Sequence, residues 1–184
     1  VRGLSLCPPS GKTTPIENLF NQSCIIDLRA VGSGETKAFF MGLLLLKLFE
    51  YRHHQGLNKT LKHVTVVEEA HNLLRRTSIE QSQEGANPRG LAVEMFINAI
   101  AEMRAYGQGF TIVDQSPTSL DINVIKNTNT KITLRTPYYE DRELVGRSSN
   151  MSEEQMDELG KLETGVIAVY QNDWIEPVLC KVPY

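Results

Sequence analysis

The chain has few of the features that mark a disulfide-stapled or membrane-spanning protein. Its 184 residues include only three cysteines, far apart and without a Cys-x-x-Cys pair, so neither a disulfide framework nor a cysteine zinc site is expected. The longest apolar run, residues 38–46, is about half as long as a membrane-spanning helix. The first residues do not resemble a signal peptide. We therefore expect a cytoplasmic protein with no membrane span.

The chain also has no excess of basic over acidic residues. The formal net charge is -3, which argues against a surface broadly coated for DNA, although basic contacts can be confined to one loop. Residues 75–90 are such a candidate, because Arg75, Arg76 and Arg89 lie among small polar residues. The alternative is an ordinary solvated loop. The sequence begins with Val1 rather than Met, and we expect it to be a piece of a longer protein.

The apolar pattern predicts strands that alternate with helices. Residues 1–22 are rich in Pro, Ser, Thr and Asn and predict a loop or mobile arm, followed by one domain over residues 23–184. Buried strands are expected at residues 24–28, 64–67, 110–115 and 131–135, helices at 36–53, 91–106, 138–145 and from 151, and a hairpin at 166–170 and 177–182. A polar connector is expected at 54–61. This order predicts an α/β fold with a mostly parallel sheet flanked by helices and a C-terminal β-hairpin, with its chemistry at the carboxyl ends of the strands.

Two adjacent carboxylates end the second strand. Residues 64–67 are Val-Thr-Val-Val, and Glu68 and Glu69 follow directly. This is the Walker B arrangement, in which Glu68 is placed to hold a Mg²⁺ shell through water. Glu69 is placed to orient and deprotonate the water that attacks a γ-phosphate. A buried strand that simply ends in solvated acids is an equally strong interpretation of these residues alone.

Two further side chains are candidates for the same chemistry. Gln115 ends the strand at 110–115 and can contact a γ-phosphate or the attacking water without adding charge; capping of the strand is the plainer alternative. Arg104 ends the helix at 91–106, from which it can reach a neighbouring subunit's nucleotide. The plainer interpretation is a surface arginine that is favourable to the helix dipole. Rival arginines are Arg135, Arg142 and Arg147.

Two other patterns are rejected as sites. Residues 10–14, Ser-Gly-Lys-Thr-Thr, imitate the end of a phosphate-binding loop, but Leu6 stands where its first glycine belongs, and two prolines remove backbone donors. The four histidines lack zinc-site spacing. We expect His71 to be a hydrogen-bonding residue at the exit of the second strand.

Taken together, several segments resemble the HerA-like ATPases of the HerA–FtsK group. The resemblance is carried by residues 63–74, 86–90, 94–96, 101–107, 109–117, 125–132 and 141–143, in order along the chain. It implies a partial RecA-like P-loop NTPase core from a hexameric, ATP- and Mg²⁺-dependent motor that moves DNA. It further implies Glu68 as the acid on the Mg²⁺ side, Glu69 as the catalytic base, Gln115 as the sensor and Arg104 as a finger acting in trans. The implied partners are sister subunits, duplex DNA and a nuclease or defence effector.

One departure from the family shapes the hypothesis. The phosphate-binding loop that should precede this region is missing, so we expect the C-terminal part of an ATPase that alone neither binds ATP tightly nor hydrolyses it. Two alternatives stay open. One is a non-catalytic assembly or binding module of the same fold, and the other is a secretion or conjugation motor whose cargo is protein.

Overall fold

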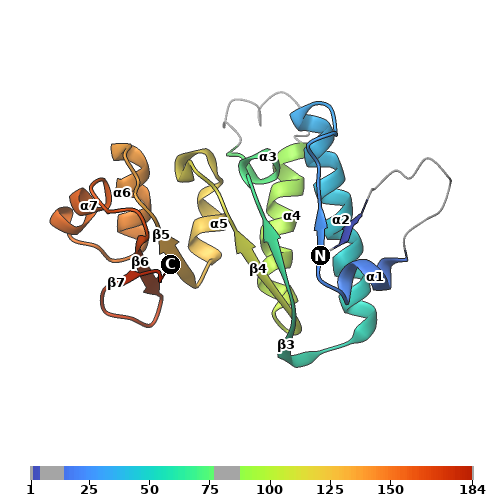
Figure 1. Cartoon of the computed structure of the whole chain (residues 1–184). Helices are drawn as coiled ribbons and strands as arrows, with labels where there is room; N and C mark the ends of the chain where they lie inside the picture. Colours follow the sequence, from blue (N-terminus) through green and yellow to red (C-terminus); the bar gives the residue numbers. More distant parts are fainter. Residues whose placement is uncertain (1, 5–14, 77–87, 184) are drawn as a thin grey trace.

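The computed structural model describes residues 2–4, 15–76 and 88–183, which form strands and helices that alternate along much of the chain (Figure 1). The first half contains β1 (Arg2–Leu4), α1 (Ile16–Phe20), β2 (Cys24–Ile26), α2 (Gly34–Gln55), β3 (Asn58–Val67), α3 (His71–Leu74), α4 (Pro88–Met103) and β4 (Tyr106–Ile112). The second half contains the 3-10 turn η2 (Pro117–Ser119), α5 (Ile122–Asn127), β5 (Thr130–Thr133), α6 (Tyr139–Ser148), α7 (Glu153–Leu159), β6 (Val166–Gln171) and β7 (Val178–Lys181).

The strands form parallel pairs followed by an antiparallel sheet. β1 pairs with β2 and β3 with β4, both in parallel, while β5, β6 and β7 pair antiparallel in that order. The predicted α/β class and the C-terminal hairpin are therefore confirmed. The described strands are not joined into one continuous ladder, however, because no pairing connects β2 to β3 or β4 to β5.

The main core lies where α2 and α4 cover one face of the β3–β4 pair (Figure 1). Phe49 of α2, Phe96 of α4 and Phe110 of β4 meet with ring centroids 6.0 to 6.1 Å apart. Because side chains alternate along a strand, Val67 is buried on this face while Val64 and Val66 are 45% and 56% exposed on the other. The helices thus hold the carboxyl ends of β3 and β4 rigidly from one side.

Several boundaries differ from the sequence-based expectation. β3 begins at Asn58, inside the expected connector, because its first residues are polar and exposed and carry no apolar alternation. α4 begins at Pro88, where a missing N–H costs nothing. Gly107 lies inside β4 rather than stopping a helix. Its φ is +74°, and a Cβ atom on this residue would lie 2.5 Å from the Thr60 carbonyl oxygen, so no side chain fits there.

The expected arm also contains regular structure. β1 pairs with β2 in parallel register, and α1 buries Leu19 and Phe20 in the main core. Arg52 of α2 donates from Nη2 to the Phe20 carbonyl at 2.6 Å, which satisfies an acceptor at the end of α1. The prediction of a loop is therefore wrong for residues 2–4 and 16–20, because burial of two side chains is enough to order a short helix.

The C-terminal elements follow the sequence closely. Ser152 and Gln155 form a capping box at the start of α7, within the helix expected from residue 151. Within the described residues, no helix is long and apolar enough to cross a membrane.

Candidate functional site

The carboxyl ends of β3 and β4 place two short polar segments side by side. Val67 pairs with Ile112, the Val113 N–H donates to the Val67 carbonyl at 2.9 Å, and the Ala70 N–H donates to the Val113 carbonyl at 3.2 Å. The parallel ladder therefore continues past both strands. Residues 68–71 lie beside residues 113–115 as a direct consequence of this register.

Glu69 and Gln115, predicted separately, contact each other in the structure. Gln115 donates from Nε2 to Glu69 Oε1 at 2.8 Å. Both side chains are accessible to solvent, so a ligand can reach them. The contact pairs a carboxylate that can take a proton with a neutral amide that can donate a hydrogen bond.

The backbone of Glu69 is unusual. Its φ is +50°, and the other described non-glycine residue with positive φ is Asn150. Such a conformation costs on the order of 1–3 kcal/mol and persists where the surroundings enforce it. Asn72 enforces it by donating from both its backbone N–H and its Nδ2 to the Glu69 carbonyl, at 3.0 Å each. The turn after β3 therefore presents Glu69 in a fixed direction at an energetic cost.

His71 and Asp114 complete the cluster. Asp114, whose side chain is 3% exposed, accepts hydrogen bonds from the backbone N–H and Nδ1 of His71 at 2.8 and 2.9 Å and from the Ser116 N–H at 2.9 Å. His71 Nδ1 also lies 3.5 Å from Glu69 Oε2. The expectation that His71 forms hydrogen bonds at the strand exit is confirmed. Asp114 was missed, although its place at the end of a strand beside Gln115 was a usable signal.

Glu68 and the cavity beside it limit what this site can bind. A cavity of about 760 Å³ opens between β2 and β3, and its lining includes Lys37, Glu68, Glu69 and Asn72. The described residues contain no group of three potential metal ligands. A single exposed carboxylate still suits Mg²⁺, which is commonly held by one or two carboxylates, waters and phosphate oxygens. Glu68 thus fits a water-mediated metal contact only when a phosphate ligand supplies the remaining oxygens.

An ion pair lies on the β2 side of the same cavity. Arg29 donates to the carboxylate of Asp27 from Nε and Nη2, with the shortest contact at 2.6 Å. These side-chain hydrogen bonds, with one from the Arg29 backbone, lower the pKa of Asp27 to about 2. Both residues line the cavity with Lys37, so its lining contains two cationic side chains as well as Glu68.

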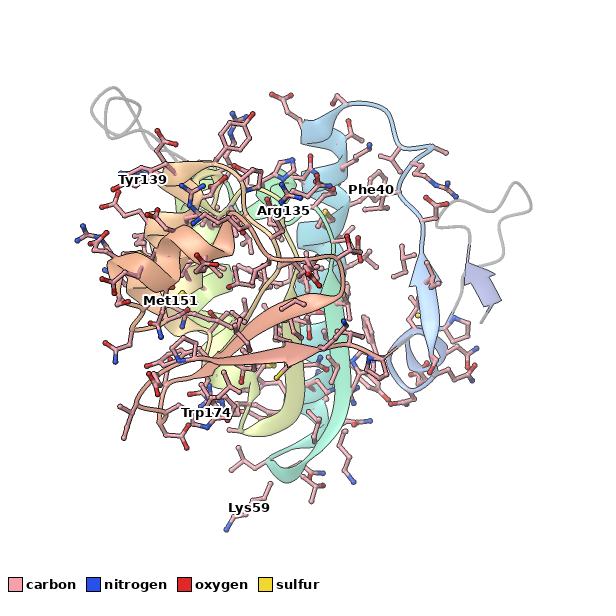
Figure 2. All side chains as sticks on the ribbon, turned by 60° about the vertical axis from the view of Figure 1, so that its left-hand side comes forward. Phe40, Lys59, Arg135, Tyr139, Met151 and Trp174 are labelled. Atoms are coloured by element: carbon pink, nitrogen blue, oxygen red, sulfur yellow. The ribbon has the colours of Figure 1, made fainter. Side chains whose placement is uncertain are left out.

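Arg104 is placed far from this cluster within the chain. It follows α4 and precedes β4, whose first residue pairs with Asn58 at the amino end of β3. Lys59 marks that end, at the bottom of Figure 2. β4 has seven residues, so at a rise of roughly 3.3 Å per residue it separates Arg104 from Gln115 by about 23 Å. The structure therefore does not bring Arg104 to Glu69 in the same chain, and a role in trans stays a prediction.

The rival arginines have structural partners. Arg147 pairs with Glu143 at 2.7 Å, Arg135 donates to the Gly160 carbonyl at 3.2 Å, and Arg142 lies over the Tyr139 ring. The phosphate-loop imitation at residues 10–14 and the middle of the 75–90 loop lie outside the described residues.

A second polar network occupies the opposite, amino ends of the strands. Gln108 Oε1 accepts from Arg52 Nε at 3.2 Å and lies 3.0 Å from His63 Nδ1. Burial, with the Arg52 charge adding to it, lowers the pKa of His63, although the Gln108 hydrogen bond acts in the other direction. This network joins α2 to β3 and β4, and we interpret it as structural.

Comparisons with known proteins reveal similarity in sequence and in fold. No family model matches the chain. Over 120 residues it is 32% identical to the DNA double-strand break repair helicase HerA of Sulfolobus acidocaldarius, a match that covers 65% of the chain. The chain therefore resembles HerA helicases in sequence. The match spans 22% of that relative's length, so the matched region corresponds to about a fifth of it.

Solved structures place the chain among the P-loop NTPases by fold. The genome packaging NTPase B204 of Sulfolobus turreted icosahedral virus 2, solved with AMPPCP, matches with a TM-score of 0.63 and 16% identity, over 94% of this chain and 73% of that one. VirB4 of Thermoanaerobacter pseudethanolicus matches with a TM-score of 0.60 and 16% identity, over 88% of this chain and 41% of that one. The predicted P-loop NTPase fold and the resemblance to HerA-like ATPases are confirmed.

Proposed function

We propose that residues 23–184 form the C-terminal part of the ATPase core of a HerA-like DNA translocase and carry its Walker B and sensor elements. The observation that carries this proposal is the Glu69–Gln115 contact at the carboxyl ends of two parallel strands, with Glu69 held in a costly backbone conformation. Costly conformations of this kind cluster at functional sites. The sequence similarity to a HerA helicase and the P-loop NTPase fold support the same function.

Each residue has one task in this proposal. Glu69 accepts the proton of the attacking water, because it is an accessible carboxylate on a rigid strand end. Gln115 orients that carboxylate and, in the loaded state, the water. Glu68 holds the metal through water. ATP with Mg²⁺ supplies the phosphoanhydride bond that is cleaved. Arg104 acts on the nucleotide of a neighbouring subunit in a hexameric ring.

The phosphate cradle is proposed to come from sequence outside this region. The described residues include the proposed acid, base and sensor, but they contain no Gly-x-x-x-x-Gly-Lys-Ser/Thr phosphate-binding loop. Val64, Val66, Ile132 and Leu134 expose 45 to 63% of their surface. Apolar residues this exposed in or beside strands are typical of a surface that another segment or subunit covers. The isolated region is therefore proposed to be inactive, and duplex DNA and a nuclease or defence effector to be partners of a complete cytoplasmic protein.

The experiment separates the two carboxylates in a protein that carries this region with a phosphate loop. Glu69→Gln is expected to lower kcat by about 10²–10⁴-fold, the range for a positioned acid–base group, with ATP binding retained. Glu68→Gln is expected to raise the Mg²⁺ concentration needed for half-maximal turnover. Glu50→Gln is the matched control, because Glu50 pairs with Lys47 on the surface of α2.

The outcomes distinguish the alternatives. Near-normal turnover of Glu69→Gln removes Glu69 as the base. Failure of the unmodified protein to bind ATP favours a non-catalytic assembly module. Hydrolysis that duplex DNA leaves unchanged contradicts DNA as the cargo and favours a motor that moves protein.

A further inference from the structure

We propose that Asp114 and His71 act together as positioning residues that fix the carboxylate of Glu69 for proton transfer. This inference rests on the proposed role of Glu69 and extends it to two residues that act through Glu69. Glu69 Oε1 is held by Gln115 at 2.8 Å, and Oε2 lies 3.5 Å from His71 Nδ1. The pair therefore acts on the oxygen that Gln115 leaves free.

The hydrogen bonds define which nitrogen of His71 carries a proton. An ionised carboxylate only accepts hydrogen bonds, and Asp114 Oδ2 lies 2.9 Å from Nδ1. Nδ1 must therefore be the protonated nitrogen, and in the neutral ring Nε2 is the acceptor. The same Nδ1 lies between Asp114 Oδ2 and Glu69 Oε2. This places the N–H of one ring between two carboxylates, with Asp114 the nearer.

The surroundings of Asp114 fix its carboxylate beside the His71 ring. Its side chain is 3% exposed, and its ion-pair partner among the described residues is His71. Burial of a carboxylate is costly unless donors replace water, and three donors do so here: the His71 backbone N–H, His71 Nδ1 and the Ser116 N–H. Two of these belong to the turn after β3 and one to the turn after β4. Asp114 thus fixes the two turns to each other at the point where Glu69 and Gln115 meet.

The consequence for a reaction is geometric. Glu69 sits in a left-handed backbone conformation between Val67 of β3 and His71 of α3. If His71 is released, the turn is free to relax, and Glu69 Oε2 loses its neighbour. A misplacement of about 1 Å can cost roughly 10²-fold in rate. We therefore expect loss of the pair to lower kcat by about 10–100-fold with KM changed by less than about threefold, because the pair is proposed to act through the position of Glu69 rather than by binding the nucleotide.

The decisive variant is Asp114→Asn. An amide has one oxygen and one NH₂ group, so it cannot accept from both Ser116 and the two His71 donors. The first measurement uses ¹⁵N-histidine and side-chain amide NMR on the chain as it stands and needs no nucleotide. In the unmodified chain His71 is expected as the Nδ1–H tautomer, and in Asp114→Asn the population of that tautomer is expected to fall, because a neutral amide accepts less strongly than a carboxylate. In that variant the Gln115 amide signals are expected to move toward their positions in Glu69→Ala.

Two variants of His71 distinguish the loss of its N–H donor from a simple loss of packing. His71→Asn keeps an N–H donor near the place of Nδ1, whereas His71→Leu removes it. In a protein that hydrolyses ATP, His71→Asn is expected to retain more of kcat than His71→Leu. His53→Leu is the matched control, because His53 also pairs with a carboxylate, Glu102, at 3.2 Å. That pair lies at the other end of the strands, so its loss is expected to leave kcat unchanged.

The results separate this inference from the proposed function. An Nε2–H tautomer in the unmodified chain, or Gln115 signals that do not move in Asp114→Asn, overturns the inference whatever the activity. If Asp114→Asn does not fold, as judged by circular dichroism, the Gln115 amide signals are compared in His71→Leu and His71→Asn. They are expected to move further from their unmodified positions in His71→Leu. If the NMR results are as expected but no variant or parent hydrolyses ATP, the proposed function fails while the positioning of Glu69 stands.

Discussion

The left-handed backbone of Glu69 predicts opposite effects on stability at two adjacent positions. Glycine is expected to be more stable than alanine at position 69, and alanine more stable than glycine at position 68. We compare Gly and Ala at position 69 and again at position 68. Both replacements remove the side chain beyond Cβ, so the lost contacts cancel in each comparison. What remains is the preference of the backbone. Glu69 has a φ of +50°, whereas Glu68 is not among the described residues with positive φ.

The magnitude follows from two opposing terms. An L-residue in the left-handed region costs about 1–2 kcal/mol, which glycine does not incur. Glycine loses more conformational entropy on folding, which favours alanine by roughly 0.5–1 kcal/mol at an ordinary position. At position 69 the difference leaves Gly more stable than Ala by about 1 kcal/mol. At position 68 only the entropy acts, and Ala is more stable than Gly by roughly 0.5–1 kcal/mol.

Urea unfolding followed by far-UV circular dichroism measures both differences. For a slope near 2 kcal/mol per M, a difference of about 1 kcal/mol moves the midpoint by roughly 0.5 M. The expected result is that Glu69→Gly unfolds at higher urea than Glu69→Ala, with the order reversed at Glu68. If Glu69→Ala is as stable as Glu69→Gly, the turn after β3 is not held in the left-handed conformation. Backbone strain at Glu69 then no longer supports a functional role for this residue.

Two further predictions concern the opposite end of the strands. Burial lowers the pKa of His63 below its ordinary 6.5, so the unfolded chain binds more protons at this residue than the folded chain does. The contribution of neutral His63 to the free energy of unfolding is therefore fully present above pH 6.5 and declines as the pH falls. His63→Gln is expected to flatten the drop in urea midpoint between about pH 8 and about pH 5, and an unchanged drop would contradict the pKa shift. Subunits with Arg104→Ala, mixed with subunits that carry Glu69→Gln, are expected to recover part of the ATP turnover at mixed interfaces. No recovery at any mixing ratio would exclude a role in trans.

The fold was predictable where apolar residues recur, and less so where they do not. The strand ends at Val67 and the hairpin of β6 and β7 follow from short apolar runs, and the capping box at Ser152 follows from local chemistry. The first half of β3 is polar and exposed, so its extension to Asn58 comes from pairing with β4 rather than from its own pattern. α1 forms because Phe20 finds a place in the core, and burial of this kind is not encoded in local composition.

The candidate site also combines features that the sequence predicts with features that only the structure reveals. The closeness of Glu69 and Gln115 was predictable because each follows a short apolar strand, and parallel strands bring their carboxyl ends together. The pairing of His71 with Asp114 depends on the register Val67 to Ile112, which sequence alone leaves open. The left-handed backbone of Glu69 was equally invisible, since no glycine or asparagine signals it. Long-range register and local strain are therefore what the structure adds.

In the proposed mechanism Glu69 takes the proton from the water that cleaves ATP. Single-turnover release of γ-phosphate measures this step, in a protein that joins this region to a phosphate loop and with ATP saturating for both the unmodified form and Glu69→Gln. We expect equal amounts of bound ATP and a rate of release lower by about 10²–10⁴-fold in the variant. Equal rates of release from equally loaded proteins would contradict it.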